Sequence, residues 1–198
     1  MTNQKLSIEI GVADTDRLRA AQLYEEAFGA KLGIAISRQE HRINLLRDGI
    51  NLSHAITVLE GEYLVGLAGF TTNSTAFTGG ITYRKILREL GFFKGQKAAL
   101  VLGLFERKAR ENELLMDGIA VASEYRGKGY GSKLFAALID YAKEHSYQTI
   151  RLDVIDTNPD ARRLYERLGF VAERTNTFEG LRPWLGFGAS TTMVYSLS

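Results

Sequence analysis

The 198-residue chain contains no cysteine and only three histidines, two prolines and one tryptophan. Without cysteine it forms no disulfide, uses no thiolate nucleophile and holds no metal through sulfur. His41, His54 and His145 are far apart in the sequence, so their spacing predicts no metal site. We therefore expect a protein without a metal, and the lack of disulfides fits a cytoplasmic location.

An excess of one charge and a long apolar run are also missing. The 25 Lys and Arg residues nearly balance 23 Asp and Glu, and the net charge of +2 is too small to predict nucleic-acid binding. The longest apolar stretch, residues 98–105, is far shorter than the ~20 residues that cross a bilayer. The first ten residues lack the apolar core of a signal peptide. We expect a soluble protein with neither a membrane nor a nucleic acid as partner.

Glycine, by contrast, is concentrated in the stretch SEYRGKGYGSKLF at residues 123–135. Gly127, Gly129 and Gly131 directly precede an amphipathic helix predicted over about 131–145. The N-terminus of a helix offers unpaired N–H groups and the positive end of a dipole. Glycines let successive amides face a single anion, so the stretch predicts a phosphate-binding loop.

Several other interpretations of this loop exist. A Walker A loop needs glycine, lysine and then serine or threonine, but Gly131 is followed by Ser132 and Lys133 in the wrong order. A dinucleotide fingerprint needs a third glycine where Ser132 stands, although Asp153 lies roughly where a ribose-binding acid would. A solvated turn that caps a helix is the plain structural alternative. The loop by itself leaves these interpretations open.

Elsewhere, apolar periodicity and turn residues predict a β-α-α-β-β … β-α-β-α-β-β order in one domain over residues 1–198. The predicted strands cover 6–12, 55–60, 63–70, 114–121, 149–155, 170–178 and 191–197. The predicted helices are one that Asp14 or Thr15 caps and others at 36–47, 81–90, about 96–110, about 131–145 and after Asn158. The second and third strands form a hairpin, and a helical insertion occupies about 73–110.

A second motif follows the strand at 149–155. Asn158 suits the N-cap of a helix, Pro159 its first position and Gly169 the position just after its end. The motif reads Asn158-Pro159-x-Ala161-x-x-Leu164-Tyr165-x-x-x-Gly169-Phe170.

Together, the two stretches resemble the GNAT family of N-acetyltransferases. Arg126-x-x-Gly129-x-Gly131 is similar to the family's acyl-CoA loop, and the Asn158 motif is similar to its second signature. The resemblance is specific over about 113–171. It implies an α/β (α+β) GNAT acyl-CoA N-acyltransferase fold, with a mixed, mostly antiparallel sheet flanked by helices.

The resemblance also implies acetyl-CoA as co-substrate, bound between the strands at 114–121 and 149–155, which splay apart in the family. Strand amides would hold the pantetheine arm and loop amides the pyrophosphate. The implied cofactor-binding residues are Ile119, Val121, Arg126, Gly127, Lys128, Gly129, Tyr130, Gly131, Ser132 and Asn158.

Three residues are candidates for the chemistry. Tyr165 shares an apolar helix face, which fits simple packing, but the resemblance implies that it donates a proton to the leaving thiolate of coenzyme A. Asp117 interrupts an apolar strand, and Asp153 matches the glutamate of family members that acetylate ribosomal-protein N-termini. Leu115 stands where histone-acetylating members carry a glutamate. Either aspartate is a candidate base or simply an ion-paired acid.

The resemblance thus implies an N-acetyltransferase that moves the acetyl group to a primary amine of a small molecule, peptide or protein, by direct attack in a ternary complex. The alternatives are a non-catalytic acyl-CoA-binding sensor of the same fold and a nucleotide-binding protein. For the acceptor pocket we expect an apolar wall from Phe178, Trp184 and Phe187. The 71–110 segment is expected to cover this pocket or to contact a second copy of the chain.

Overall fold

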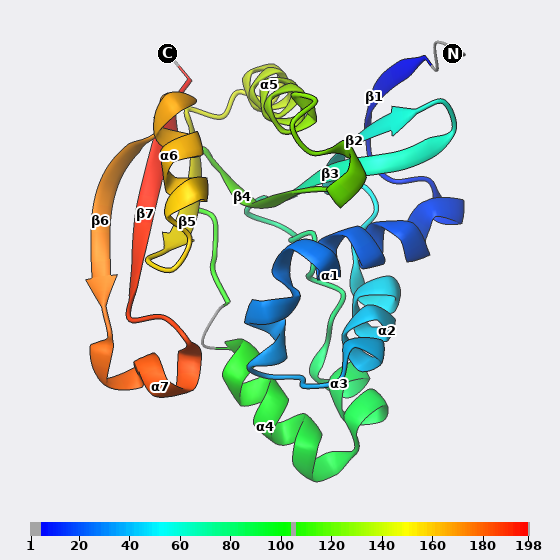
Figure 1. Cartoon of the computed structure of the whole chain (residues 1–198), viewed down its shortest axis with the longest axis vertical. Coiled ribbons are helices and arrows are strands. Elements are labelled where there is room, and N and C mark those ends of the chain that lie inside the picture. The colour runs from blue at the N-terminus through cyan, green and yellow to red at the C-terminus, as the bar shows by residue number, and fades with distance from the viewer. Residues whose placement is uncertain (1–4, 104–105, 198) are drawn as a thin grey trace.

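The computed structural model describes residues 5–103 and 106–197, and its centre is a sheet of seven strands with helices on both faces (Figure 1). The strands are β1 (Leu6–Ile10), β2 (Ala55–Glu60), β3 (Tyr63–Thr71), β4 (Glu113–Val121), β5 (Thr149–Ile155), β6 (Val171–Thr177) and β7 (Ala189–Ser196). Their order in the sheet is β1-β2-β3-β4-β5-β7-β6.

Neighbouring strands run antiparallel except for β4 and β5, which are parallel. The sheet is therefore mixed and mostly antiparallel, as predicted. The predicted hairpin joins β2 to β3 at Gly61, whose φ of 66° is in the left-handed region that glycine adopts without strain.

The helices are α1 (Arg17–Gly33), α2 (Gln39–Gly49), α3 (Tyr83–Leu90), α4 (Phe92–Gly103), α5 (Tyr130–Glu144), α6 (Pro159–Arg167) and α7 (Arg182–Leu185). The element order matches the prediction except for the short helix α7, which lies where a loop was predicted between the last two strands; α3 and α4 lie inside the predicted insertion. The helix predicted over about 96–110 is displaced: α4 starts at Phe92, and residues 106–110 are not helical. Residues 104 and 105 of that prediction lie outside the described residues.

Two main cores cover the two faces of the sheet. On one face, α5 packs Leu134, Phe135 and Leu138 against β2–β5; on the other, α1 packs against β2–β4. A third, small cluster of Ile36, Leu45, Ile86 and Ala98 joins α2 to α3 and α4. The insertion thus lies beyond α2, away from the sheet (Figure 1).

The predicted N-cap is confirmed for α6 and wrong for α1. Asn158 Oδ1 accepts a hydrogen bond from the amide of Ala161 at 3.2 Å, so the predicted N-cap of α6 is confirmed. Before α1, in contrast, a 3₁₀ turn over Asp14–Asp16 intervenes, and no side chain caps the helix. The carboxylate of Asp14 instead accepts from Arg17 Nε at 3.0 Å, which removes it from the capping position.

No helix within the described residues is long and apolar enough to cross a membrane.

Candidate active site

The glycine loop forms an open cradle at the start of α5. Gly127 and Gly129 have φ values of 78° and 79°, and Gly129 is the N-cap of α5. A Cβ atom added at either glycine would meet no atom within 4 Å. These glycines are therefore needed for backbone conformation rather than for packing, and the first amides of α5 lack helical partners, as at every helix start.

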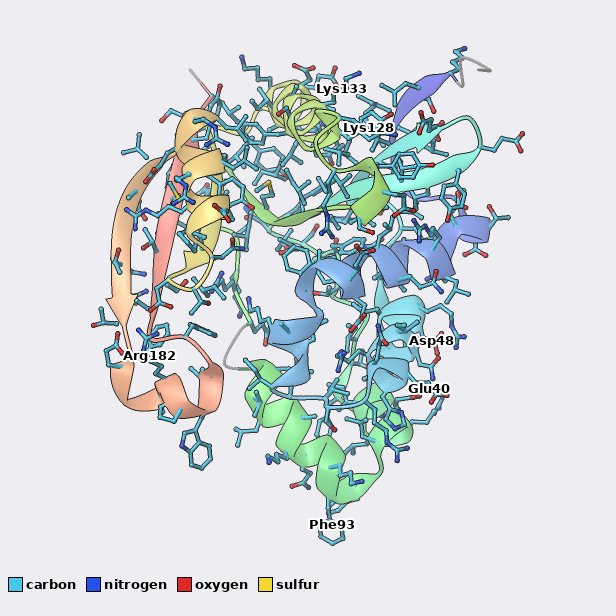
Figure 2. The ribbon with its side chains drawn as sticks, viewed as in Figure 1. Glu40, Asp48, Phe93, Lys128, Lys133 and Arg182 are labelled. Carbon is cyan, nitrogen blue, oxygen red and sulfur yellow. The ribbon has the colours of Figure 1, made fainter. Side chains whose placement is uncertain are left out.

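The cations of the loop have different surroundings. Lys128 precedes α5 and Lys133 lies in its first turns (Figure 2), with Lys128 Nζ 4.4 Å from the centre of the Tyr125 ring. Arg126 donates from Nε to the carbonyl of Val121 at 3.1 Å and pairs with Glu26 at 2.8 Å. The side chain of Tyr130 is buried in the core, and its ring stacks on that of Tyr125 with centroids 6.2 Å apart.

Strands β4 and β5 separate after a short contact. They pair only over three residues of each strand, Glu113–Leu115 with Thr149–Arg151. The amide of Ala122 donates to Val65 on β3 at 2.9 Å. Because amides alternate along a strand, those of Ile119 and Val121 face away from β3, towards the side of the splay. An extended acyl-CoA arm can pair with amides in this position.

A cavity of about 780 Å³ lies where the strands diverge. It is lined by residues of α1, α2, the 71–86 segment, α4, β4, β5 and α6. Asp117, Asp153, Asn158 and Tyr165 all line it. These four predicted site residues, which come from one sequence motif and two strands, therefore share one cavity.

Asp117 lies on a β-bulge. The register of β3 against β4 shifts at this residue, since Gly69 pairs with Gly118 but Phe70 pairs with Met116. Thr71 Oγ1 donates to both carboxylate oxygens of Asp117, at 3.1 and 3.0 Å. Burial raises the pKa of Asp117 to about 6, and the hydrogen bond from Thr71 and the nearby Lys31 only partly oppose this. A carboxyl with this pKa is suited to accept a proton near neutral pH.

The bulge is accommodated because residue 118 has no side chain. A Cβ at Gly118, whose φ is 152°, would lie 2.1 Å from Cζ of Phe28 on α1. We expect Gly118→Ala to lower the free energy of unfolding by ~2–4 kcal/mol through backbone strain and overpacking, as measured by urea denaturation. Gly131→Ala is the matched control, because its Cβ would have only an ordinary contact, with Ile119 at 4.0 Å. An equal loss in both variants would contradict the proposed clash.

Asp153 has a different environment from Asp117. Its carboxylate pairs with Arg107 Nη1 at 2.7 Å and accepts from Thr192 Oγ1 at 2.5 Å. Its side chain is only 6% exposed. A carboxylate engaged by an arginine and a hydroxyl on both oxygens is less suited to take a proton from a substrate.

Lys31 of α1 also lines the cavity. Burial lowers its pKa to about 8; Arg107 adds to this effect, and Asp153 and Asp117 oppose it. Sequence reasoning missed Lys31, Arg107 and Thr71, since no local motif marks them. Only the tertiary fold brings them to the two aspartates.

Tyr165 projects from α6, and its ring packs edge-to-face against Phe170 at 5.7 Å between centroids. Burial raises the pKa of its phenol to about 12, so the group keeps its proton across the working pH range. Its presence at the cavity provides a hydrogen-bond donor close to the splayed strands.

The predicted aromatic wall is wrong for this cavity. Among the described residues, its lining includes none of Phe178, Trp184 and Phe187. Phe187 is buried against Phe178, with ring centroids 5.7 Å apart, and Trp184 is 80% exposed. The walls come instead from α1, α2 and the inserted helices. Within residues 5–103 and 106–197, no group of three or more His, Cys, Asp or Glu residues is arranged to hold a metal ion.

Comparison with known proteins agrees with this geometry. Residues 18–170 match the family model described as Acetyltransferase (GNAT) family. An acetyltransferase from Salmonella typhimurium, solved with its cofactor acetyl-CoA, superimposes with a TM-score of 0.60 at 18% identity, covering 98% of this chain and 94% of that one. At this identity the structural likeness supports the fold alone.

Two sequence relatives match the chain in part. The spermine/spermidine N(1)-acetyltransferase of Bacillus subtilis (strain 168) is 30% identical over 94 residues, which are 45% of this chain and 62% of the relative. The [ribosomal protein bS18]-alanine N-acetyltransferase of Haemophilus influenzae is 41% identical over 59 residues, 30% of this chain and 40% of the relative. The chain thus matches less than two thirds of the length of these relatives.

Proposed function

Because the chain belongs to the GNAT acetyltransferase family, we propose that it transfers the acetyl group of acetyl-CoA to a primary amine by direct attack within a ternary complex. The observation that carries the proposal is the cavity at the diverging ends of β4 and β5, which the half-buried carboxyl of Asp117 and the half-buried phenol of Tyr165 both line. The residues present fit acetyl-CoA: an open glycine cradle at a helix start lies beyond strand amides that face the splay.

In this proposal the amides from Gly127 to Ser132 bind the pyrophosphate, and Lys128 adds positive charge. Arg126 orients the loop through Val121 and Glu26 rather than binding phosphate itself. The amides of Ile119 and Val121 hold the pantetheine arm. The side-chain Oδ1 of Asn158 caps α6. Its side-chain Nδ2 contacts the same pantetheine arm.

The chemistry needs a base because amines are protonated at neutral pH. For an amine with a pKa near 10.4, about one molecule in 2,500 is nucleophilic at pH 7, a cost of ~4.6 kcal/mol. Asp117 accepts a proton from the ammonium group, and the neutral amine then attacks the thioester carbon. The C–N bond forms as the C–S bond breaks, and the extra proton left on the new amide nitrogen passes to water. Tyr165 donates its hydrogen bond to the sulfur, where negative charge develops. Asp153 does not act as the base; it is ion-paired with Arg107 and balances the positive charge of this arginine at the cavity.

Calorimetric titration with acetyl-CoA tests the cofactor site. We expect binding by the wild type and a loss of at least ~100-fold in affinity in Gly129→Glu, because a carboxylate enters the cradle and repels the pyrophosphate. Gly186→Glu is the matched control, since Gly186 has a φ of 74° and equally open space at the end of α7. It carries the same strain and charge away from the loop and is expected to bind normally. Normal binding by Gly129→Glu would contradict the proposed cradle.

Turnover is measured as release of coenzyme A with a thiol reagent. The chain has no cysteine, so every thiol detected comes from the co-substrate. Acetyl-CoA binding without thiol release on any amine would favour the non-catalytic sensor instead.

A further inference from the structure

The acceptor side of the cavity is predominantly apolar. Its walls come from α1, α2, the segment after β3, and the inserted helices α3 and α4. The apolar side chains in this part are Phe28, Leu32, Leu46, Ile81, Ile86 and Leu102. Because α3 and α4 pack on α2 through their own small core, the insertion supplies a fixed wall to the cavity.

The charged side chains of the cavity, in contrast, lie close to side chains of opposite charge. Asp153 pairs with Arg107 at 2.7 Å, and the charge of Lys31 acts on Asp117. The remaining acid of the lining, Glu106, is exposed, so water screens it. Among the described residues of the lining, every acid is therefore engaged within the cavity or exposed to water, and none remains to pair with a second ammonium group of a substrate.

A buried ammonium group without a counter-charge is strongly disfavoured. The cavity shows this effect on its own lysine, because burial is the main cause of the lowered pKa of Lys31. Burial in the same cavity lowers the pKa of a single amine that enters it, so this amine loses its proton and becomes nucleophilic. A polyamine would bring further charges that remain protonated, whereas an apolar body gains from leaving water.

We infer that the acceptor is a small primary amine carried on an apolar aliphatic or aromatic body, with this body lying against the inserted helices and its amine directed to Asp117. The inference rests on the proposed function and assigns its substrate class. The cavity volume of about 780 Å³ is in the range of small-molecule sites.

Leu102 and Leu100 of α4 provide a matched pair of variants. Leu102 lines the cavity, whereas Leu100 is 72% exposed and does not. Leu102→Asp places a carboxylate in the apolar wall, while Leu100→Asp adds the same charge to the same helix outside the cavity.

The deciding measurement is equilibrium binding of hexylamine, ethanolamine and spermidine to the complex with coenzyme A, by calorimetry. We expect wild type to bind hexylamine at least ~10-fold more tightly than either of the others. Leu102→Asp should lose this preference by ~10-fold or more and gain affinity for spermidine, while Leu100→Asp behaves as wild type. Tighter binding of spermidine or ethanolamine by the wild type, or an unchanged preference in Leu102→Asp, overturns the inference.

Thiol release with the same amines separates this inference from the proposed function. Hexylamine binding without turnover supports the substrate class and contradicts the transferase activity. Turnover of spermidine or a peptide amine, with no binding of hexylamine, supports the transferase and overturns the substrate class.

Discussion

Replacing Tyr165 by phenylalanine is expected to lower kcat by on the order of 10²-fold, with the dissociation constant of acetyl-CoA and the melting temperature unchanged. In the proposed reaction the phenol meets the departing sulfur, so its loss should affect the transition state and not cofactor binding. The ring itself keeps its packing on Phe170. Steady-state rates and calorimetry measure the two quantities.

Tyr195→Phe is the control for this change. Tyr195 also packs against Phe170, at 5.6 Å between ring centroids, but it does not line the cavity. We expect it to leave kcat unaltered. Equal rates for Tyr165→Phe and wild type would remove Tyr165 from the chemistry and leave it as a packing residue, as the non-catalytic alternative requires.

The working pH also follows from Tyr165. With its pKa at about 12, the phenol retains its proton at neutral and mildly alkaline pH. An alkaline decline in activity near pH 8 would therefore come from another group. Lys31, whose pKa is about 8, loses its positive charge there, and the pKa of Asp117 then rises for lack of a neighbouring cation.

Local signals predicted the parts of the fold that local physics determines. Asn158, Pro159 and Gly169 mark the ends of α6 correctly because a helix terminus is decided by a few neighbouring residues. The same reasoning was wrong at α1, where Arg17 takes the side chain of Asp14 away from the helix start. A capping pattern shows which residue could cap a helix, but it does not show that the side chain of Arg17 binds the carboxylate of Asp14 instead.

The site was predictable in its motifs but not in its electrostatics. Asp117 and Asp153 look equivalent in the sequence, as single acids in apolar strands. The fold distinguishes them through Arg107, which follows the inserted helices and pairs with Asp153 alone at short range. The aromatic wall was wrong for a related reason, since apolar composition does not indicate which side of a loop faces a cavity.

Asp117→Asn is expected to abolish most activity and, at the same time, to stabilise the fold. As the proposed base, Asp117 limits kcat/KM on the acid side, so wild-type activity should fall about tenfold per pH unit below its pKa of about 6. The asparagine variant should lose on the order of 10²-fold in kcat/KM and show no such acid limb. A retained acid limb would assign the base to another group.

The stability effect has the opposite sign because the folded protein holds the Asp117 proton more tightly than the unfolded chain does. Wild-type stability is therefore reduced as pH rises from about 4 to about 6, and the full cost, about 3 kcal/mol for two pKa units, persists above that range. Asparagine carries no charge and still accepts the hydrogen bond from Thr71, so it should be more stable at pH 8 and gain nothing at pH 4. Asp153→Asn should instead lose stability at pH 8, since it leaves Arg107 without its partner. Urea denaturation of these variants at pH 4 and pH 8 measures the free energy of unfolding and distinguishes two roles for Asp117. In the first role the carboxyl lowers stability and is kept for the reaction; in the second it only holds the strands together. Destabilisation by Asp117→Asn at pH 8 would assign it the second role.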